Sequence, residues 1–164
     1  MSLRSDLEKS DIKFWKNSCV QIKPIESQAD VIYAGYDCQL TSEQREFVNP
    51  FWFTMGRAYL FREDNLPCII YNESNERIGF INFTKWLGNG DAYSWSYFID
   101  VKYQGKGYGK ASARLAVDIL KLSNPEMQIK LAAEASNISA HSLYLSLGFQ
   151  KLSEMDGDDL VFGF

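Results

Sequence analysis

Residues 93–120 read YSWSYFIDVKYQGKGYGKASARLAVDIL, and the hydrophobic period changes halfway along them. In residues 93–101 every second side chain is apolar, which predicts a strand. In residues 109–122 the apolar side chains recur at helical spacing, which predicts an amphipathic helix. Three glycines lie between the two periods. The sequence therefore predicts a strand that leads into a helix through a glycine loop.

The glycine loop, QGKGYGK at residues 104–110, has the composition of an anion-binding site. Glycine tolerates positive φ and carries no Cβ that would keep a phosphate away from the main chain. The first N–H groups of the following helix have no partners inside the helix, and the helix dipole favours negative charge there. A flexible strand-to-helix connection is the plainer alternative. We expect the main chain of this loop to hold a phosphate group.

Two common nucleotide-binding motifs do not fit this loop. The third glycine of the dinucleotide fingerprint is missing, because Lys110 and Ser112 occupy the two positions where it could stand. A P-loop would need glycine in place of Gln104 and a hydroxyl residue in place of Ala111. Nucleotide hydrolysis is therefore not expected.

Strands and helices continue to alternate downstream of the loop. Residues 127–133 alternate as a strand, and a helix opens at Asn137 and stops at Gly148. Residues 149–154 and 160–164 predict a closing hairpin. The second half of the chain thus has the order β-α-β-α-β-β.

The first half of the chain follows a polar N-terminal arm. Its predicted segments are a strand at residues 20–25, helices at 29–40 and 42–61, and a hairpin of 67–71 with 77–86. Pro50 is expected to divide the second helix. The apolar phase shifts within residues 77–86, which predicts a bulge or a strand buried on both faces.

Length and composition predict one domain over residues 1–164. The net charge of −4 argues against nucleic acid or an anionic membrane as partner, because both reward clustered Lys and Arg. No run of 18 apolar residues is present, so no membrane span is expected. Three cysteines without CxxC spacing predict reduced thiols in a cytoplasmic protein, and a single histidine argues against a His-built metal site.

Two motifs together resemble the GCN5-related N-acetyltransferase (GNAT) family. The glycine loop resembles the family's acetyl-CoA signature, Gln/Arg-x-x-Gly-x-Gly/Ala, through Gln104, Gly107 and Gly109. The segment Asn137-x-x-Ala140-x-x-Leu143-Tyr144-x-x-Leu147-Gly148-Phe149 is similar to the family's second conserved segment, one helix and one strand further on. Within the family, residues 98–110 look most like the diamine and polyamine (spermine/spermidine) acetyltransferases.

The resemblance implies an α/β fold with a mixed, mostly antiparallel twisted sheet of six or seven strands and helices on both faces. It also implies acetyl-CoA as cosubstrate, entering where two parallel strands part, and no metal. The expected cofactor-binding residues are Phe98, Ile99, Gln104, Gly105, Lys106, Gly107, Tyr108, Gly109, Lys110 and Asn137. For Asn137 the sequence offers an alternative role as the N-cap of the next helix.

Acetyl transfer needs an unprotonated amine and an acid for the departing thiolate. The resemblance makes Tyr144 that general acid, although its helical spacing with Leu143 and Leu147 also suits a core residue. The strand before the glycine loop lacks the acidic residue that relatives acting on polyamines often carry. The expected base is therefore Glu134, with Asp100 as a second candidate and solvated carboxylates as the plainer interpretation of both. His141 is a weaker candidate.

The expected acceptor is a small primary amine or a polyamine, which suits the acidic balance of the chain. The alternatives are a protein amine, an aminoglycoside, or a non-catalytic module that senses acyl-CoA. The aromatic candidates for a wall around the acceptor are Trp52, Phe53, Tyr59, Trp86, Tyr93 and Trp95. The carboxylate candidates for attracting an ammonium are Glu43, Glu46 and Asp91. The closing hairpin leaves a sheet edge, so a homodimer is a further expectation.

Overall fold

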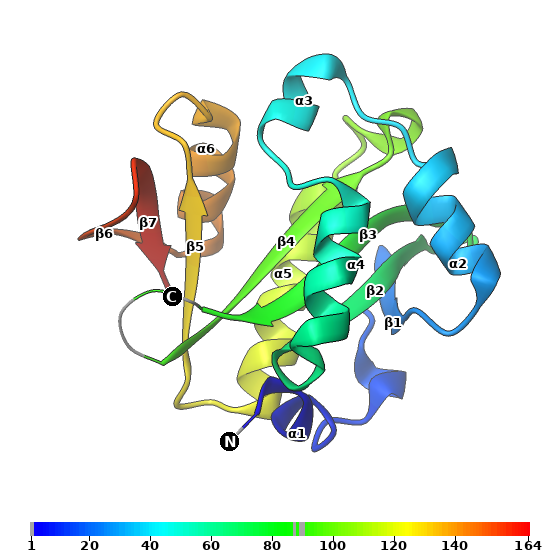
Figure 1. The fold of residues 1–164 in the computed structure, drawn as a ribbon, viewed down its shortest axis with the longest axis horizontal. Helices are drawn as coiled ribbons and strands as arrows, with labels where there is room; N and C mark the ends of the chain where they lie inside the picture. Colours follow the sequence, from blue (N-terminus) through cyan, green and yellow to red (C-terminus); the bar gives the residue numbers. More distant parts are fainter. Residues whose placement is uncertain (1, 87, 89–90) are drawn as a thin grey trace.

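A computed structural model describes residues 2–86, 88 and 91–164 and contains a seven-stranded sheet in the order β1-β2-β3-β4-β5-β7-β6 (Figure 1). The strands are β1 (Val20–Pro24), β2 (Asn65–Asn72), β3 (Arg77–Lys85), β4 (Ala92–Ile99), β5 (Gln128–Ala133), β6 (Gln150–Asp156) and β7 (Asp159–Gly163). Only β4 and β5 pair in parallel, and all other neighbours are antiparallel. The expected mixed, mostly antiparallel sheet of six or seven strands is confirmed.

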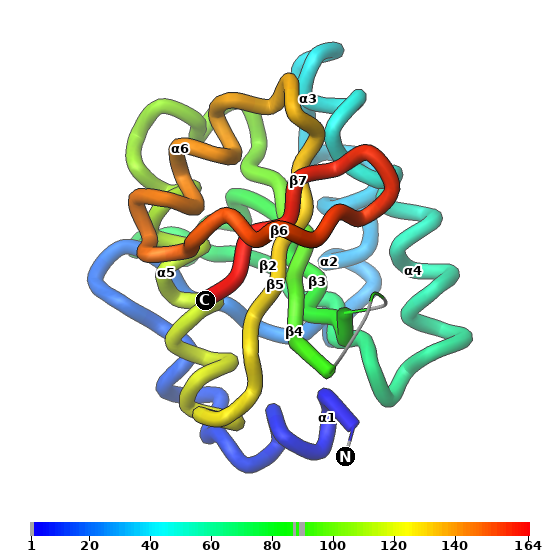
Figure 2. The backbone as a smooth tube through the Cα atoms, turned by 90° about the vertical axis from the view of Figure 1, so that its left-hand side faces the viewer, coloured from blue at the N-terminus to red at the C-terminus, as the bar shows by residue number. Residues whose placement is uncertain are grey.

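Helices cover both faces of this sheet, as Figures 1 and 2 show. The α-helices are α1 (Leu3–Leu7), α2 (Gln28–Ile32), α3 (Ser42–Glu46), α4 (Phe51–Leu60), α5 (Tyr108–Ser123) and α6 (Ile138–Leu147). The larger core lies between the sheet and α5, with α1 and α6 at its margins, and a smaller cluster around Phe80 packs beneath α4. Pro50 stands directly before α4, so the predicted division of the second helical segment is confirmed.

The hairpin of β2 and β3 contains the predicted irregularity. Ile70 lies opposite Gly79, but Tyr71 lies opposite Arg77, so Ile78 is an extra residue on β3. Residues 78–83 are all buried, because β3 is a central strand covered on both faces. Both forms of the prediction, a bulge and burial on two sides, therefore apply to this strand.

The parallel pair of β4 and β5 is short. Only Ala92 with Gln128 and Tyr93 with Ile129 are paired, although β4 continues to Ile99. Beyond these pairs the two strands diverge, which leaves residues 94–99 of β4 without a partner on that side (Figure 1). The sheet thus has an open gap between its N-terminal and C-terminal halves.

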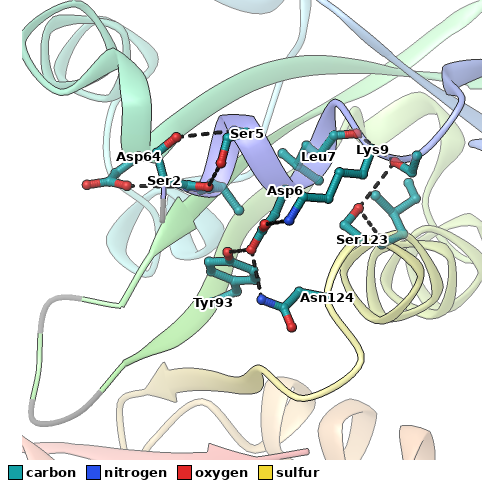
Figure 3. A network of polar contacts seen from close by, with 12 residues as sticks. Ser2, Ser5, Asp6, Leu7, Lys9, Asp64, Tyr93, Ser123 and Asn124 are labelled. Carbon is teal, nitrogen blue, oxygen red and sulfur yellow. Dashed lines mark hydrogen bonds and ion pairs between the residues drawn. The ribbon is translucent and has the colours of Figure 1, made fainter.

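The N-terminal arm is more ordered than its polar composition predicts. Asp6 of α1 is fully buried and accepts hydrogen bonds from Lys9, Tyr93 and Asn124, the last at 2.8 Å (Figure 3). Burial by itself would raise the pKa of Asp6, but these hydrogen bonds outweigh it and lower the pKa to about 2. The arm is therefore fixed to β4 and to the end of α5 by one buried carboxylate.

The structure bears on two further expectations from composition. Cys19, Cys38 and Cys68 are all free thiols. Across the described ranges, no helix combines the length and hydrophobicity that crossing a bilayer requires.

Candidate active site

The glycine loop follows β4 through a short 3-10 turn, η4 (Val101–Tyr103). Gly105 has φ of 73° and Gly107 has φ of 87°, a region that residues with a Cβ rarely adopt. Gly107 is the N-cap of α5 and provides no side-chain hydrogen bond to the helix. The glycines are therefore required by the main-chain path, and the N-terminus of a 16-residue helix is left uncapped.

The space in front of the loop is open. A Cβ built on Gly105 or Gly107 would meet no other atom within 4 Å, and one on Gly109 would meet only the hydroxyl of Tyr97 at 3.6 Å. Packing within the protein therefore does not explain the glycines. An uncapped helix N-terminus with open space before it, and no acidic residue in the first turn of α5, suits a diphosphate group.

The side chain of Gln104 holds the loop in place. Its amide nitrogen donates to the carbonyl oxygen of Ile99 at 2.7 Å and to the amide oxygen of Gln44 at 3.0 Å. Gln44 returns a hydrogen bond to Gln104 at 2.7 Å, so the two amides pair reciprocally. The first residue of the signature thus acts through its side chain, which joins β4, the glycine loop and α3.

The main-chain groups of β4 that face the gap belong to Tyr97 and Ile99. In an antiparallel ladder, alternate residues direct both main-chain groups toward the partner strand. Asp100 donates its N–H to Ile78 at 2.8 Å, and two residues earlier the main chain of Phe98 likewise faces β3. Tyr97 and Ile99 therefore face the side that β5 has left. The carbonyl oxygen of Ile99 accepts the Gln104 amide there, so the main chain of Tyr97 and the N–H of Ile99 are the groups available to an extended ligand. The sequence indicated Ile99 but missed Tyr97.

Asn137 caps α6, as the alternative interpretation expected. Its side-chain oxygen accepts the N–H of Ala140 at 3.2 Å. Its amide N–H₂ group has no hydrogen bond within the described chain and remains available as a donor. The capping role is therefore established, and it leaves one end of the side chain open to a ligand.

Tyr144 is half-buried on the inner side of α6. Its ring packs against Phe149 and Phe162, with centroids 5.9 and 5.4 Å away, which matches the core interpretation. Its hydroxyl makes no hydrogen bond to any residue that the structure describes. Burial raises the pKa of Tyr144 to about 12, so the phenol is protonated at neutral pH. Burial and the neighbouring Tyr144 together raise the pKa of Tyr97, which lies across from it on β4.

The candidate bases differ in their surroundings. Asp100 is 1% exposed and accepts the N–H of Lys102 at 3.1 Å, so it caps the η4 turn. His141 lies 2.9 Å from the carbonyl oxygen of Glu134 and stacks its ring on Phe162. Glu134 itself is exposed at the end of β5.

Four carboxylates form an acidic rim beside the end of β5: Glu134, Asp156, Asp158 and Asp159. Burial, followed by the charges of Glu134, Asp156 and Asp158, raises the pKa of Asp159. The sequence indicated only Glu134, because the contacts of the others arise from the folding of the β6–β7 hairpin across the end of β5. Among the described residues no group of three or more side chains could hold a metal ion.

A cavity of about 230 Å³ lies where β4 and β5 part, on the face of the sheet that α4 covers. Its wall includes Trp95 and Ser96 of β4 and Ala132 of β5, so it contacts both diverging strands. The remaining wall comes mainly from α4, from β3 and from Asp156 of the acidic rim. A ligand in this cavity would therefore lie beside the gap in the sheet.

The expected acceptor wall is only partly present. Phe53, Trp86 and Trp95 belong to the wall, but the ring of Trp95 packs against Phe149, with centroids 5.9 Å apart, in the core on the α5 side of the sheet. Trp52 and Tyr59 are more than 70% exposed, and Tyr93 is fully buried against Asp6. None of the three carboxylates that were expected to attract an ammonium lines the cavity: Glu43 and Glu46 are exposed on α3, and Asp91 pairs with Lys85 at 3.3 Å. Polar side chains of β3 and β4 occupy much of the wall instead.

Two parallel strands part beside an uncapped helix N-terminus, which is the arrangement that the resemblance to the acyl-CoA-dependent acetyltransferases implied. A model of the Acetyltransferase (GNAT) family matches residues 32–149. The chain belongs to this acetyltransferase family, and the resemblance seen in its two motifs is confirmed. It is an acetyl-CoA-dependent N-acetyltransferase, with acetyl-CoA as cosubstrate.

Solved structures share the fold at low sequence identity. An acetyltransferase from Agrobacterium tumefaciens str. C58 superposes with a TM-score of 0.70 at 16% identity, covering 91% of this chain and 92% of that one. Mycobacterium smegmatis RimJ in complex with CoA-disulfide gives 0.69 at 16% identity, covering 88% and 81%. An aminoglycoside acetyltransferase in complex with coenzyme A gives 0.67 at 20% identity, covering 88% and 92%. No curated protein sequence matched significantly.

Proposed function

We propose that this enzyme acetylates a primary amine of a small molecule, with Tyr144 as the general acid. The observation that carries the proposal is the gap between β4 and β5, which is adjoined by the glycine loop, by the main chain of Tyr97 and the N–H of Ile99, and by a cavity. A pantetheine arm in the gap would bring its thioester to the cavity. The diphosphate would lie on the main chain of residues 104–110, and Asn137 would donate its free amide to the cofactor.

The proposed reaction is direct attack. The amine lone pair attacks the thioester carbonyl, a C–N bond forms, and the C–S bond breaks as the tetrahedral intermediate collapses. The thiolate receives a proton from the Tyr144 hydroxyl, and the nitrogen loses one proton to a base. The raised pKa keeps Tyr144 protonated until the thiolate develops. Its free hydroxyl and its position beside Tyr97 on β4 support this role.

We propose Glu134 as the base that accepts the proton which the attacking nitrogen loses. Glu134 is exposed, and it belongs to the acidic rim whose member Asp156 lines the cavity. A proton could pass from the cavity to Glu134 through Asp156 or through water. Comparing Glu134→Gln with Asp156→Asn tests the assignment. If only Asp156→Asn lowers turnover at limiting amine, Glu134 is not the base.

The size of the cavity favours a small acceptor over an aminoglycoside. Pockets that enclose drug-sized ligands measure about 300–1,000 Å³, and this cavity measures about 230 Å³. The polyamine subclass, which rests on the glycine-loop resemblance, has less support from the wall, where Arg57 and Lys85 face one carboxylate, Asp156. Coenzyme A release with spermine and spermidine tests that subclass directly.

The experiment that tests the function combines binding and turnover. Calorimetric titration with acetyl-CoA should show saturable binding, and coenzyme A release should rise on adding a suitable primary amine. Binding without turnover of any amine would favour a non-catalytic sensor. Turnover of peptide amines alone would favour a protein acceptor. The cytoplasmic location and the homodimer remain predictions. The edge strand β6 carries the charged residues Lys151 and Glu154, which oppose pairing with another strand. Sedimentation velocity would measure the oligomeric state.

A further inference from the structure

The cavity beside the gap contains an unpaired cation. Arg57 of α4 lines the cavity, and its guanidinium has no ion pair or hydrogen bond to any residue in the described ranges. Lys85 also lines the cavity, but it pairs with Asp91. Asp156, on the opposite side at the end of β6, is the one carboxylate in the described wall. A half-buried guanidinium without a counter-ion is typical of a site for an anion.

The cavity also contains a hydrogen-bond acceptor whose orientation is fixed. Asn65 donates its amide to the carbonyl oxygen of Phe61 at 2.9 Å, and Asn82 donates to the amide oxygen of Asn65 at 3.0 Å. A carbonyl can only accept, so the first bond fixes the Asn65 amide and the second fixes the Asn82 amide. The oxygen of Asn82 is left without a partner although the residue is only 4% exposed. A buried acceptor without a partner in the described chain is normally satisfied by a water molecule or by a ligand donor.

These two groups lie on different elements of the cavity wall. Asn82 lies opposite Ser96 in the sheet, next to Trp95 at the gap, whereas Arg57 lies on the helix above. The cavity thus offers an acceptor on the sheet and a cationic donor on the helix that covers it.

We propose that the acceptor is a small amine that also carries an anionic group, a carboxylate or a phosphate ester. Its nitrogen donates to the Asn82 oxygen near the thioester, and its anion pairs with Arg57. The acidic rim of Glu134, Asp156, Asp158 and Asp159, of which Asp156 lines the cavity, attracts the ammonium end from solution. This inference rests on the proposed acetylation of a small amine and specifies its substrate class.

The charge of the wall distinguishes this acceptor from a polyamine. A polyamine that placed one nitrogen at the gap would hold a second cation close to Arg57. Like charges that are only partly solvated repel each other, whereas an anion at the same place forms charge-assisted hydrogen bonds. A neutral amine would satisfy Asn82 but would leave Arg57 without a counter-ion.

Matched amines test the proposal through the specificity constant. The pairs are O-phosphoethanolamine with ethanolamine, β-alanine with its amide, and glucosamine 6-phosphate with glucosamine, and spermidine is added as a polycation. We expect kcat/KM to be about tenfold or more higher for the anionic member of at least one pair. Arg57→Gln should abolish that preference, and Arg57→Lys should keep part of it. Arg62→Gln is the matched control, because Arg62 lies just beyond α4 and does not line the cavity.

A binding measurement distinguishes failure of this substrate class from failure of the proposed acetylation. Calorimetry on the CoA-loaded protein should show tighter binding of the same anionic member, and Arg57→Gln should remove the difference. Equal or weaker binding of the anionic members, or a preference for spermidine, overturns the proposal while any turnover still sustains the proposed function. If acetyl-CoA binds but no amine in the panel is bound or acetylated, both proposals fail. Preference that survives in Arg57→Gln also overturns the role of Arg57.

Discussion

At the scale of single residues, the proposed chemistry depends on one hydroxyl group. We expect Tyr144→Phe to lower kcat by about 100-fold or more, because a positioned general acid contributes roughly 10²–10⁴ to the rate. The phenylalanine ring retains the packing against Phe149 and Phe162. Acetyl-CoA affinity should therefore stay within a factor of about two, as measured by calorimetry. An unchanged kcat would remove Tyr144 from the mechanism.

The pKa of the same residue predicts the shape of the pH profile. Burial raises the pKa of Tyr144 to about 12, so the phenol stays protonated, and competent as an acid, far above neutral pH. We expect kcat at saturating amine to show no fall between pH 8 and pH 10. A decline in that range that is absent from Tyr144→Phe would mean that the phenol ionises there, contrary to the environment described.

Gly107 allows a direct test of the phosphate site. At its φ of 87° an alanine is strained by roughly 1–2 kcal/mol, and its Cβ would project into the open space before α5. We expect Gly107→Ala to weaken acetyl-CoA binding about tenfold or more. Gly157→Ala in the β6–β7 turn is the control, since its φ is 58° and its Cβ would also meet nothing within 4 Å. An equal loss of affinity in both variants would indicate strain alone.

At the scale of elements, the Gln44–Gln104 pair connects α3 to the glycine loop. Each variant, Gln44→Ala and Gln104→Ala, should lower the free energy of unfolding by about 0.5–1.5 kcal/mol, and the double variant should lose less than the sum, because the pair is shared. Denaturant unfolding measures the coupling. Gln28→Ala, at an exposed position of α2, is the control. Strict additivity would mean that the amide pair contributes nothing.

The sequence predicted elements well where one period continued over many residues. The strand of residues 93–101, the glycine loop and the helix after it lie close to their expected positions, because alternation and helical spacing each leave a clear apolar face. The added η4 turn could not be anticipated, since it depends on Asp100 capping Lys102. Likewise, the Asp6 carboxylate accepts hydrogen bonds from Tyr93 and Asn124, which lie 87 and 118 positions further along the chain. No local sequence pattern encodes such contacts.

The site was predicted less completely than the fold. The glycine loop and Tyr144 stand in motifs, so their positions were clear from local spacing. The cavity was missed because Asn65, Asn82 and Ser94 come from three strands whose register only the folded sheet defines. Their alternation with apolar neighbours was nevertheless visible. Polar residues on the inner face of a central strand are therefore a signal that deserved a functional interpretation.

At the scale of the whole molecule, one carboxylate makes stability depend on pH. The pKa of the Asp6 carboxyl is about 2 in the folded protein and ordinarily 3.8. Between these two pH values the unfolded chain therefore binds more protons than the folded protein does. Asp6 thus stabilises the fold by about 2 kcal/mol above pH 4, and this contribution disappears between pH 4 and pH 2. We expect Asp6→Asn to be less stable at pH 7 and to lose less stability across the window. Urea unfolding at several pH values measures it; parallel curves would contradict the role.

The shortness of the β4–β5 ladder has a consequence for the order of events during turnover. Two residue pairs join the halves of the sheet, and the acceptor cavity takes its wall from both halves. Acetyl-CoA lies between the two halves, so it connects them through contacts that main-chain pairing does not provide. An amine that binds before acetyl-CoA enters a cavity that lacks the part of its wall formed by the cofactor. The enzyme should therefore load its donor before its acceptor, with the thioester serving as part of the surface that the amine recognises.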